Sequence, residues 1–179
     1  MSKLKPSVTA LDHVRGDLHA PVILVEYGDF QCPHCGAAYP IVKKIEKDYR
    51  DKIAFVFRHF PLAEIHPFAQ AAAIASEAAA SQGKFWQMHA LIFENQHLLG
   101  LEMLIQLAES LQLDMKKFSH DFKDPNMFKK VEDDFESGIL SGVNGTPSFY
   151  INGAKYNDSY DYDSITAAIS QAAVSKTTT

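Results

Sequence analysis

The chain has two cysteines, Cys32 and Cys35, which stand in the sequence Cys32-Pro33-His34-Cys35. Two residues separate them, so the sulfurs lie about one helical turn apart and can close and reopen a disulfide. The pair therefore indicates redox chemistry carried by the chain itself.

The residues around the pair predict a corner between a strand and a helix. A β-rich segment occupies 22–27, and apolar residues recur at helical spacing over 37–45. If Cys32 is the N-cap, Pro33 takes the first helical position, where its fixed φ and missing N–H cost least. Cys35 is then one turn inside the helix.

This position predicts that Cys32 is held as a thiolate. Its sulfur can accept hydrogen bonds from the N–H groups of His34 and Cys35, which have no partner within the helix, and the helix dipole adds to the effect. An imidazolium at His34 would add positive charge although the dipole opposes its protonation, so Cys32 and His34 are expected to titrate together. We expect Cys32 to be the exposed attacking sulfur and Cys35 the shielded resolving sulfur.

A stabilised thiolate makes the corresponding disulfide easier to reduce, by about 1.4 kcal/mol for each unit by which the pKa falls. The pair is therefore expected to be an oxidant.

A zinc site needs about four ligands, and no second CxxC accompanies this one. A haem-attachment motif would have histidine where Gly36 stands. A purely structural disulfide normally closes a longer loop.

The composition is that of an ordinary globular domain of 179 residues, with 46% hydrophobic and 22% charged residues. A formal net charge of −5 argues against a nucleic-acid partner. No apolar signal segment follows residues 1–7, and the alanine-rich stretch 69–80 is too short to span a bilayer. We expect a cytoplasmic protein without a membrane span, or a periplasmic or other extracytoplasmic one if a leader was removed.

The remaining elements must position the cysteine corner. A second strand is predicted over 53–60, ended by Pro61. Several amphipathic helices are predicted between 67 and 141. Their inward residues are expected to include Leu101, Ile105 and Phe128. His89 is expected to be a satisfied packing residue rather than a ligand.

Asn152-Gly153 predicts a type I′ hairpin over 148–156. A last amphipathic helix should then turn Ile165 and Ile169 inward. Surface or core packing is expected for Arg58, His59 and His66, and the alternative for each is a position at the border of the site.

In the order of these elements and in three segments, the chain resembles the DsbA-like thiol-disulfide oxidoreductases of the thioredoxin superfamily. The segments are Tyr27–Cys35, Phe57–Leu62 and Gly142–Phe149. The resemblance implies an α/β thioredoxin fold with a helical insertion between the second strand and a cis-proline hairpin. It implies one domain, 12–175, with a core at 12–62 and 142–175, an insertion at 63–141, and flexible termini at 1–11 and 176–179.

The resemblance also implies roles for residues outside the cysteine motif. Pro147 is implied to be the cis-proline beside the sulfurs, and Thr146 to present its backbone to an extended substrate peptide. Glu26 is implied to lie under the active site and to move the proton of the second cysteine. The alternative for Glu26 is a solvated strand position, if its odd-numbered neighbours form the only inward face.

Together these expectations describe a thiol-disulfide oxidoreductase, most simply a dithiol oxidase, that acts on protein or peptide thiols through a mixed disulfide. The expected site residues are Cys32, Cys35, His34, Pro33 and Glu26 for catalysis and Thr146 and Pro147 for substrate binding. No cofactor is expected beyond the Cys32–Cys35 disulfide, which an unidentified redox partner must restore. The alternatives are a disulfide reductase or isomerase, a glutathione-dependent transferase or isomerase on the same fold, and a metal-binding module.

Overall fold

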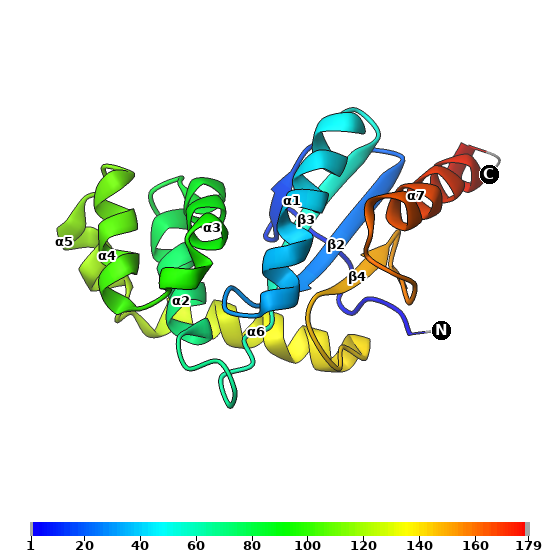
Figure 1. Ribbon diagram of the computed structural model, residues 1–179. Coiled ribbons are helices and arrows are strands. Elements are labelled where there is room, and N and C mark those ends of the chain that lie inside the picture. The colour runs from blue at the N-terminus through cyan, green and yellow to red at the C-terminus, as the bar shows by residue number, and fades with distance from the viewer. Residues whose placement is uncertain (1, 178–179) are drawn as a thin grey trace.

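The computed structural model describes residues 2–177, and within them five strands form one mixed sheet in the order β1-β3-β2-β4-β5 (Figure 1). The central pair β2 and β3 is parallel, and the other pairs are antiparallel. The strands are β1 (His13–Arg15), β2 (Val22–Gly28), β3 (Ile53–His59), β4 (Ser148–Ile151) and β5 (Ala154–Lys155).

Helices cover both faces of the sheet and extend beyond its β1 edge (Figure 1). They are α1 (Pro33–Asp48), α2 (Ala69–Ala80), α3 (Phe85–Glu94), the 3-10 helix η1 (Gln96–Leu98), α4 (Leu101–Ser110), α5 (Met115–Asp121), α6 (Pro125–Ser141) and α7 (Tyr162–Thr177). The chain has the α/β architecture that its sequence predicts. None of the helices in the described residues is long and apolar enough to cross a membrane.

Strand β2 is buried on both faces, which fixes the position of the site at its end. Leu24 belongs to the same apolar cluster as Ile45 of α1 and Ile165 of α7. The next residue, Val25, points the other way into a second cluster, which Phe135 of α6 flanks. A central parallel strand covered on both sides needs a nearly continuous apolar run, and 22–27 supplies one with Glu26 as its exception.

The helical insertion is attached to the sheet through α6. In Figure 1 this helix starts beside the helices α2, α3, α4 and α5 and ends at the underside of the sheet. There the Tyr27 and Ser137 hydroxyls lie 2.8 Å apart in a buried hydrogen bond. Gly142 ends the helix with φ of 83°, a left-handed conformation that glycine adopts readily. The second half of α6 thus packs with the thioredoxin-like core, although the sequence places it in the insertion.

The predicted hairpin is confirmed. Asn152 and Gly153 have φ of 49° and 80°, the two positive values that a type I′ turn requires. Ile165 and Ile169 of α7 are buried, as their spacing predicts.

The expectation of a flexible segment at 1–11 is corrected for the part that the structure describes. Lys3 forms a β-bridge with Ala154, and the Lys5 N–H donates to the Ser141 hydroxyl at 2.8 Å. Leu4 packs on the second apolar cluster. At the other end, α7 continues through Thr177, and residues 178–179 of the predicted flexible tail lie outside the described residues.

Three residues predicted to face inward do not. Leu101, Ile105 and Phe128 are 53%, 48% and 42% exposed. The buried stripes of α4 and α6 are therefore narrower than the periodicity indicates. Leu104 and Val131, within one turn of them, are buried.

Candidate active site

The cysteine motif forms the predicted corner at the end of β2. Cys32 is the N-cap of α1, with φ of −68° and ψ of 123°, and Pro33 occupies the first turn. Cys35 lies one turn inside the helix, and both cysteines are free thiols. The geometry inferred from the sequence is therefore confirmed.

The Cys32 sulfur lies in an environment that favours the thiolate. The pKa of Cys32 falls to about 5, first through a hydrogen bond from the Cys35 side chain and further through the Thr146 side chain and the amides of Cys35 and His34. Burial opposes this shift. The predicted capping hydrogen bonds from these two amides to the sulfur are wrong, because Cys32 has no side-chain capping hydrogen bond. The amides act on the sulfur as nearby dipoles.

Cys32 is more enclosed than the sequence predicts. It is only 4% exposed, which corrects the expectation of an exposed sulfur. The segment before β4 covers it: the Cys32 thiol donates a hydrogen bond to the Thr146 carbonyl at 3.3 Å. The Thr146–Pro147 peptide bond is cis, the isomer that the resemblance implies. The Thr146 hydroxyl is buried and has no hydrogen-bond partner.

Cys35 is fully buried and has the opposite tendency. Burial raises its pKa well above the ordinary value, and the hydrogen bond with Cys32 and the charge of Glu26 raise it further. One contact works the other way, because the Asp29 N–H donates to the Cys35 sulfur at 3.4 Å. The two sulfurs of one motif are therefore different, one ionised and one protonated near neutral pH.

Glu26 is a buried carboxyl on β2, so the alternative of a solvated strand position is wrong. It is 3% exposed, between Phe57 of β3 and Phe149 of β4 in the strand register. Burial raises its pKa to about 8, with smaller contributions from the charges of Glu46 and Cys32. Near neutral pH the Glu26 carboxyl is protonated and can give up that proton.

His34 lies on the surface side of the corner. Its Nδ1 is 3.1 Å from the Tyr160 hydroxyl, in the loop before α7. Its backbone amide, rather than its ring, is what lowers the pKa of Cys32. Pro33 is exposed beside it. The structure thus brings Cys32, Cys35, Glu26 and Thr146 together and leaves the His34 ring at the rim.

A buried carboxylate that the sequence analysis missed holds the chain on the strand side of the corner. Asp29 is 1% exposed and accepts hydrogen bonds from the N–H groups of Gln31 at 2.7 Å and Leu62 at 2.9 Å. His66 Nδ1 lies 2.7 Å from the same carboxylate, so His66 is next to the site. The local sequence signal for this role is an Asp directly after a strand, because an Asp side chain in a turn commonly accepts the backbone N–H of the residue two positions later.

Arg58 and His59 serve packing, as the sequence predicts. Arg58 is buried and forms an ion pair with Asp12 at 2.7 Å. His59 is buried at the end of β3 and bonds Glu77 of α2.

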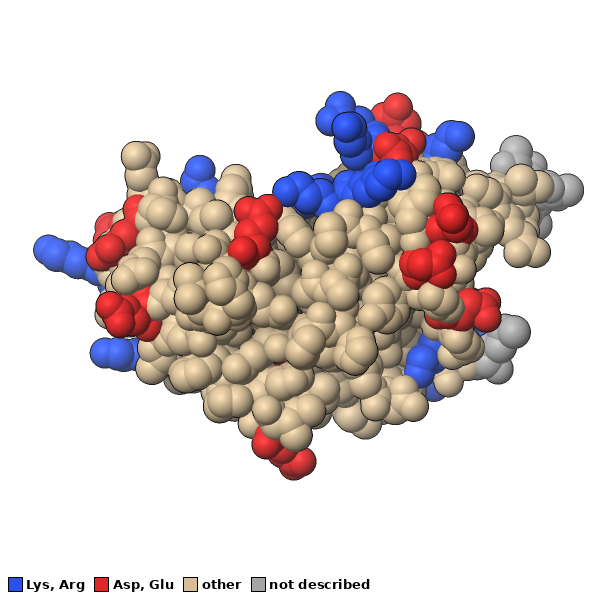
Figure 2. Space-filling view, in the orientation of Figure 1, with Lys and Arg blue, Asp and Glu red and all other residues tan. Residues whose placement is uncertain are grey.

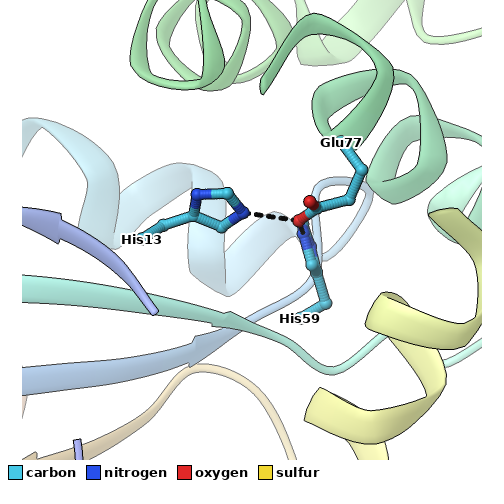
Figure 3. Close-up of side chains that lie close together, drawn as sticks. All are labelled: His13, His59 and Glu77. Atoms are coloured by element: carbon cyan, nitrogen blue, oxygen red, sulfur yellow. Dashed lines mark hydrogen bonds and ion pairs between the residues drawn. The ribbon is translucent and has the colours of Figure 1, made fainter. Parts of the chain in front are cut away.

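Figure 3 shows that His13 and His59 both point at Glu77. Their Nε2 atoms lie 2.6 and 2.7 Å from the same carboxylate oxygen. These three residues have the donor types of a metal site. However, His59 Nδ1 is buried without a partner, whereas a metal-bound histidine usually donates that N–H to an acceptor. The group fits a hydrogen-bonded clamp between the sheet edge and α2 better than a metal centre.

His89 on α3 is buried, but the expectation that it is satisfied is wrong. Neither ring nitrogen has a hydrogen-bond partner. Its ring lies among aromatic side chains, 4.7 Å from the Phe57 ring and 5.0 Å from the Phe93 ring between centroids. Burial lowers the pKa of His89 well below its ordinary value, so the ring is neutral.

The surface charge is uneven around the site. In the view of Figure 2, basic side chains gather over the far end of α1, where the sequence places Lys43, Lys44 and Lys47. The middle of this face, toward the start of α1, is almost free of charged side chains.

Comparison with known proteins agrees with the fold. A family model described as Thioredoxin matches residues 9–171. Alpha-DsbA1 of Wolbachia pipientis superposes with a TM-score of 0.84 at 22% identity, over 96% of this chain and 95% of that one. Oxidised BdbD of Bacillus subtilis gives 0.78 at 27% identity, over 90% and 92% of the two chains.

Curated sequences show a second kind of relative. The chain is 44% identical over 161 residues to a protein named Na(+)/H(+) antiporter NhaA 1 of Salinispora arenicola. It is 39% identical over 167 residues to an NhaA of Herminiimonas arsenicoxydans. The match covers 90% and 93% of this chain but only 24% and 26% of those proteins. The chain thus spans about a quarter of the length of the curated relatives it matches.

Proposed function

Because the chain belongs to the thioredoxin family and has a DsbA-like fold, we propose that it is a thiol-disulfide oxidoreductase that oxidises dithiols of protein or peptide substrates. One observation carries the proposal. Two sulfurs one helical turn apart have opposite tendencies, with the pKa of Cys32 lowered to about 5 and that of Cys35 raised.

This difference assigns the roles in the exchange. A substrate thiolate attacks the Cys32 sulfur of the Cys32–Cys35 disulfide, the disulfide bond breaks, and Cys35 leaves with the electron pair. Cys35 needs a proton because its thiolate is unfavourable, and the protonated Glu26 carboxyl supplies it. The substrate is then joined to Cys32 as a mixed disulfide.

The second step releases the product. Another substrate thiolate attacks the substrate sulfur of the mixed disulfide, and Cys32 leaves as a thiolate. Cys32 is a good leaving group because its thiolate is stabilised in the folded protein. The substrate has lost two electrons and two protons and gained a disulfide, and the protein has become a dithiol.

The same stabilisation favours the oxidising direction. Each unit by which the pKa of Cys32 falls makes the disulfide easier to reduce by about 1.4 kcal/mol, or about 30 mV. Turnover requires an oxidising compartment and a redox partner that reoxidises the dithiol.

Substrate binding is proposed at the segment before β4. The Thr146 backbone lies within hydrogen-bond distance of the Cys32 sulfur. An extended peptide paired with this backbone would present its own sulfur to Cys32. The weakly charged surface near the start of α1 suits an unfolded chain better than a charged ligand (Figure 2).

The test is the equilibrium of the protein with reduced and oxidised glutathione, followed by oxidation of a reduced, unfolded model protein. We expect a reduction potential less negative than about −200 mV and stoichiometric disulfide formation in the substrate. A potential below about −250 mV would overturn the oxidase direction in favour of a reductase. A Cys35→Ser variant that kept full turnover would instead support a glutathione-dependent transferase.

A further inference from the structure

We propose that Gln96 of the helical insertion is a positioning residue for Cys32, because its side-chain amide clamps the backbone on both sides of the reactive corner. Gln96 begins η1, between α3 and α4. Its Nε2 donates hydrogen bonds to the carbonyl oxygens of Phe30 at 2.8 Å and Cys32 at 2.9 Å.

The two acceptors are separated in sequence from Gln96 by 66 and 64 residues. Phe30 lies just beyond β2, and Cys32 is the N-cap of α1. One amide group therefore spans the turn that connects the strand to the active-site helix. The Cys32 carbonyl also accepts the N–H of Gly36 at 3.1 Å, so two donors share that oxygen.

Gly36 gives an independent indication that this contact is built into the fold. A Cβ atom at Gly36 would overlap Gln96 Oε1 and lie 3.0 Å from its Cδ. The first turn of α1 lacks a side chain where the amide lies against it. A larger residue at position 36 fits only if the Gln96 side chain turns away, which would release both carbonyls.

Holding these carbonyls has a consequence for the sulfur. The Cys32 carbonyl belongs to the peptide that leads into α1, so its orientation sets how the following amides face Cys32. The two N–H groups of Gln96 also compensate the negative ends of the nearby carbonyl dipoles, which would otherwise disfavour a thiolate. Gln96 acts through the backbone and not on the reacting atoms.

The test compares Gln96→Ala, Gly36→Ala and the double variant in the reduced protein. The readouts are the thiolate absorbance of Cys32 during a pH titration and the thermal unfolding temperature. We expect each single variant to raise the apparent pKa of Cys32 by about one unit. The double variant should show the same shift as either single one, because both changes break one contact.

Gln106→Ala is the control, since Gln106 is an exposed glutamine of α4 in the same insertion. It should leave the titration unchanged. Single variants that lower the unfolding temperature without moving the titration would overturn the proposal, as would fully additive shifts in the double variant. If Gln96→Ala does not fold, Gly36→Ala probes the same contact from α1.

The positioning role of Gln96 rests on the proposed function, but its test does not require that function. The titration uses no substrate and no redox partner. If the Gln96 variants shift the Cys32 titration but the protein oxidises no dithiol, the proposed function alone is refuted. If the protein oxidises dithiols but the Gln96 variants leave the titration unchanged, the positioning role alone is refuted.

Discussion

The Cys32 thiol donates a hydrogen bond to the Thr146 carbonyl at 3.3 Å, so residues 114 positions apart meet at the reactive sulfur. The hydroxyl of the same threonine is buried beside the sulfur without a partner. In the thiol state this hydroxyl has no acceptor. Once Cys32 loses its proton, the thiolate becomes an acceptor that the hydroxyl can reach, and the Thr146 side chain accordingly lowers the pKa of Cys32.

Thr146→Val should therefore raise the pKa of Cys32 by about one unit, the worth of one hydrogen bond to a charged group. The substitution keeps the shape and removes only the hydroxyl. Titration of the thiolate absorbance in the reduced protein measures the effect. Thr166→Val is the matched control, because the Thr166 hydroxyl bonds only backbone carbonyls of α7. An unmoved titration in Thr146→Val would show that the hydroxyl does not reach the thiolate.

Removing the buried sulfur should trap the intermediate. In Cys35→Ser the Cys32 thiolate can attack a substrate disulfide, which joins one substrate sulfur to Cys32 and releases the other as a thiol. No second protein sulfur can then displace the bound substrate, so the mixed disulfide on Cys32 should persist several-fold longer than in the unchanged protein. Mass spectrometry after acid quenching detects the adduct. Cys32→Ser should give no adduct, since burial and the raised pKa make Cys35 a poor nucleophile. An adduct on Cys35 would contradict the assignment of the two sulfurs.

The strand-helix corner could be predicted from the sequence because its determinants are local. Pro33 at the first helical position and the apolar run before it are visible within ten residues. The same holds for the Asn152-Gly153 turn, whose two residues carry the whole signal. Burial of Glu26 was harder to predict from the sequence, because it depends on whether a second layer of the fold covers the other face of β2.

The contacts that were missed are long-range. Nothing near Gln96 in the sequence indicates that its amide reaches Phe30 and Cys32, because the pairing exists only after the insertion folds back on the corner. The bridge from Lys3 to Ala154 likewise joins opposite ends of the chain. His89 was misjudged because periodicity reports burial but not hydrogen bonding.

Glu26 should make the protein less stable as the pH rises. The unfolded carboxyl loses its proton near the model value of 4.5, whereas the folded one keeps it to about 8. Between these values the native state binds more protons than the unfolded state, so the free energy of unfolding falls with rising pH, by a total on the order of 4 kcal/mol. The disulfide form is the right sample, because the reduced protein adds the opposite trend of Cys32.

Glu26→Gln should remove this slope, and urea unfolding from pH 5 to 8 measures it. The exposed Glu64→Gln serves as the control and should leave the slope intact. The same Glu26→Gln variant should slow formation of the mixed disulfide, since Cys35 loses its proton donor. A stabilised variant with unchanged exchange rates would remove Glu26 from the mechanism while keeping it as a buried acid.

Asp29→Asn should destabilise the corner by about 1–3 kcal/mol. The Asp29 carboxylate accepts the Gln31 and Leu62 N–H groups on its two different oxygens, so an amide in either orientation must turn its NH₂ toward one of these donors. Urea unfolding measures the loss. Asp17→Asn, at an exposed Asp that accepts one N–H from His19, is the control and should change stability by less than about 0.5 kcal/mol. A stability loss no larger than that of the control would show that the Asp29 carboxylate does not hold the corner.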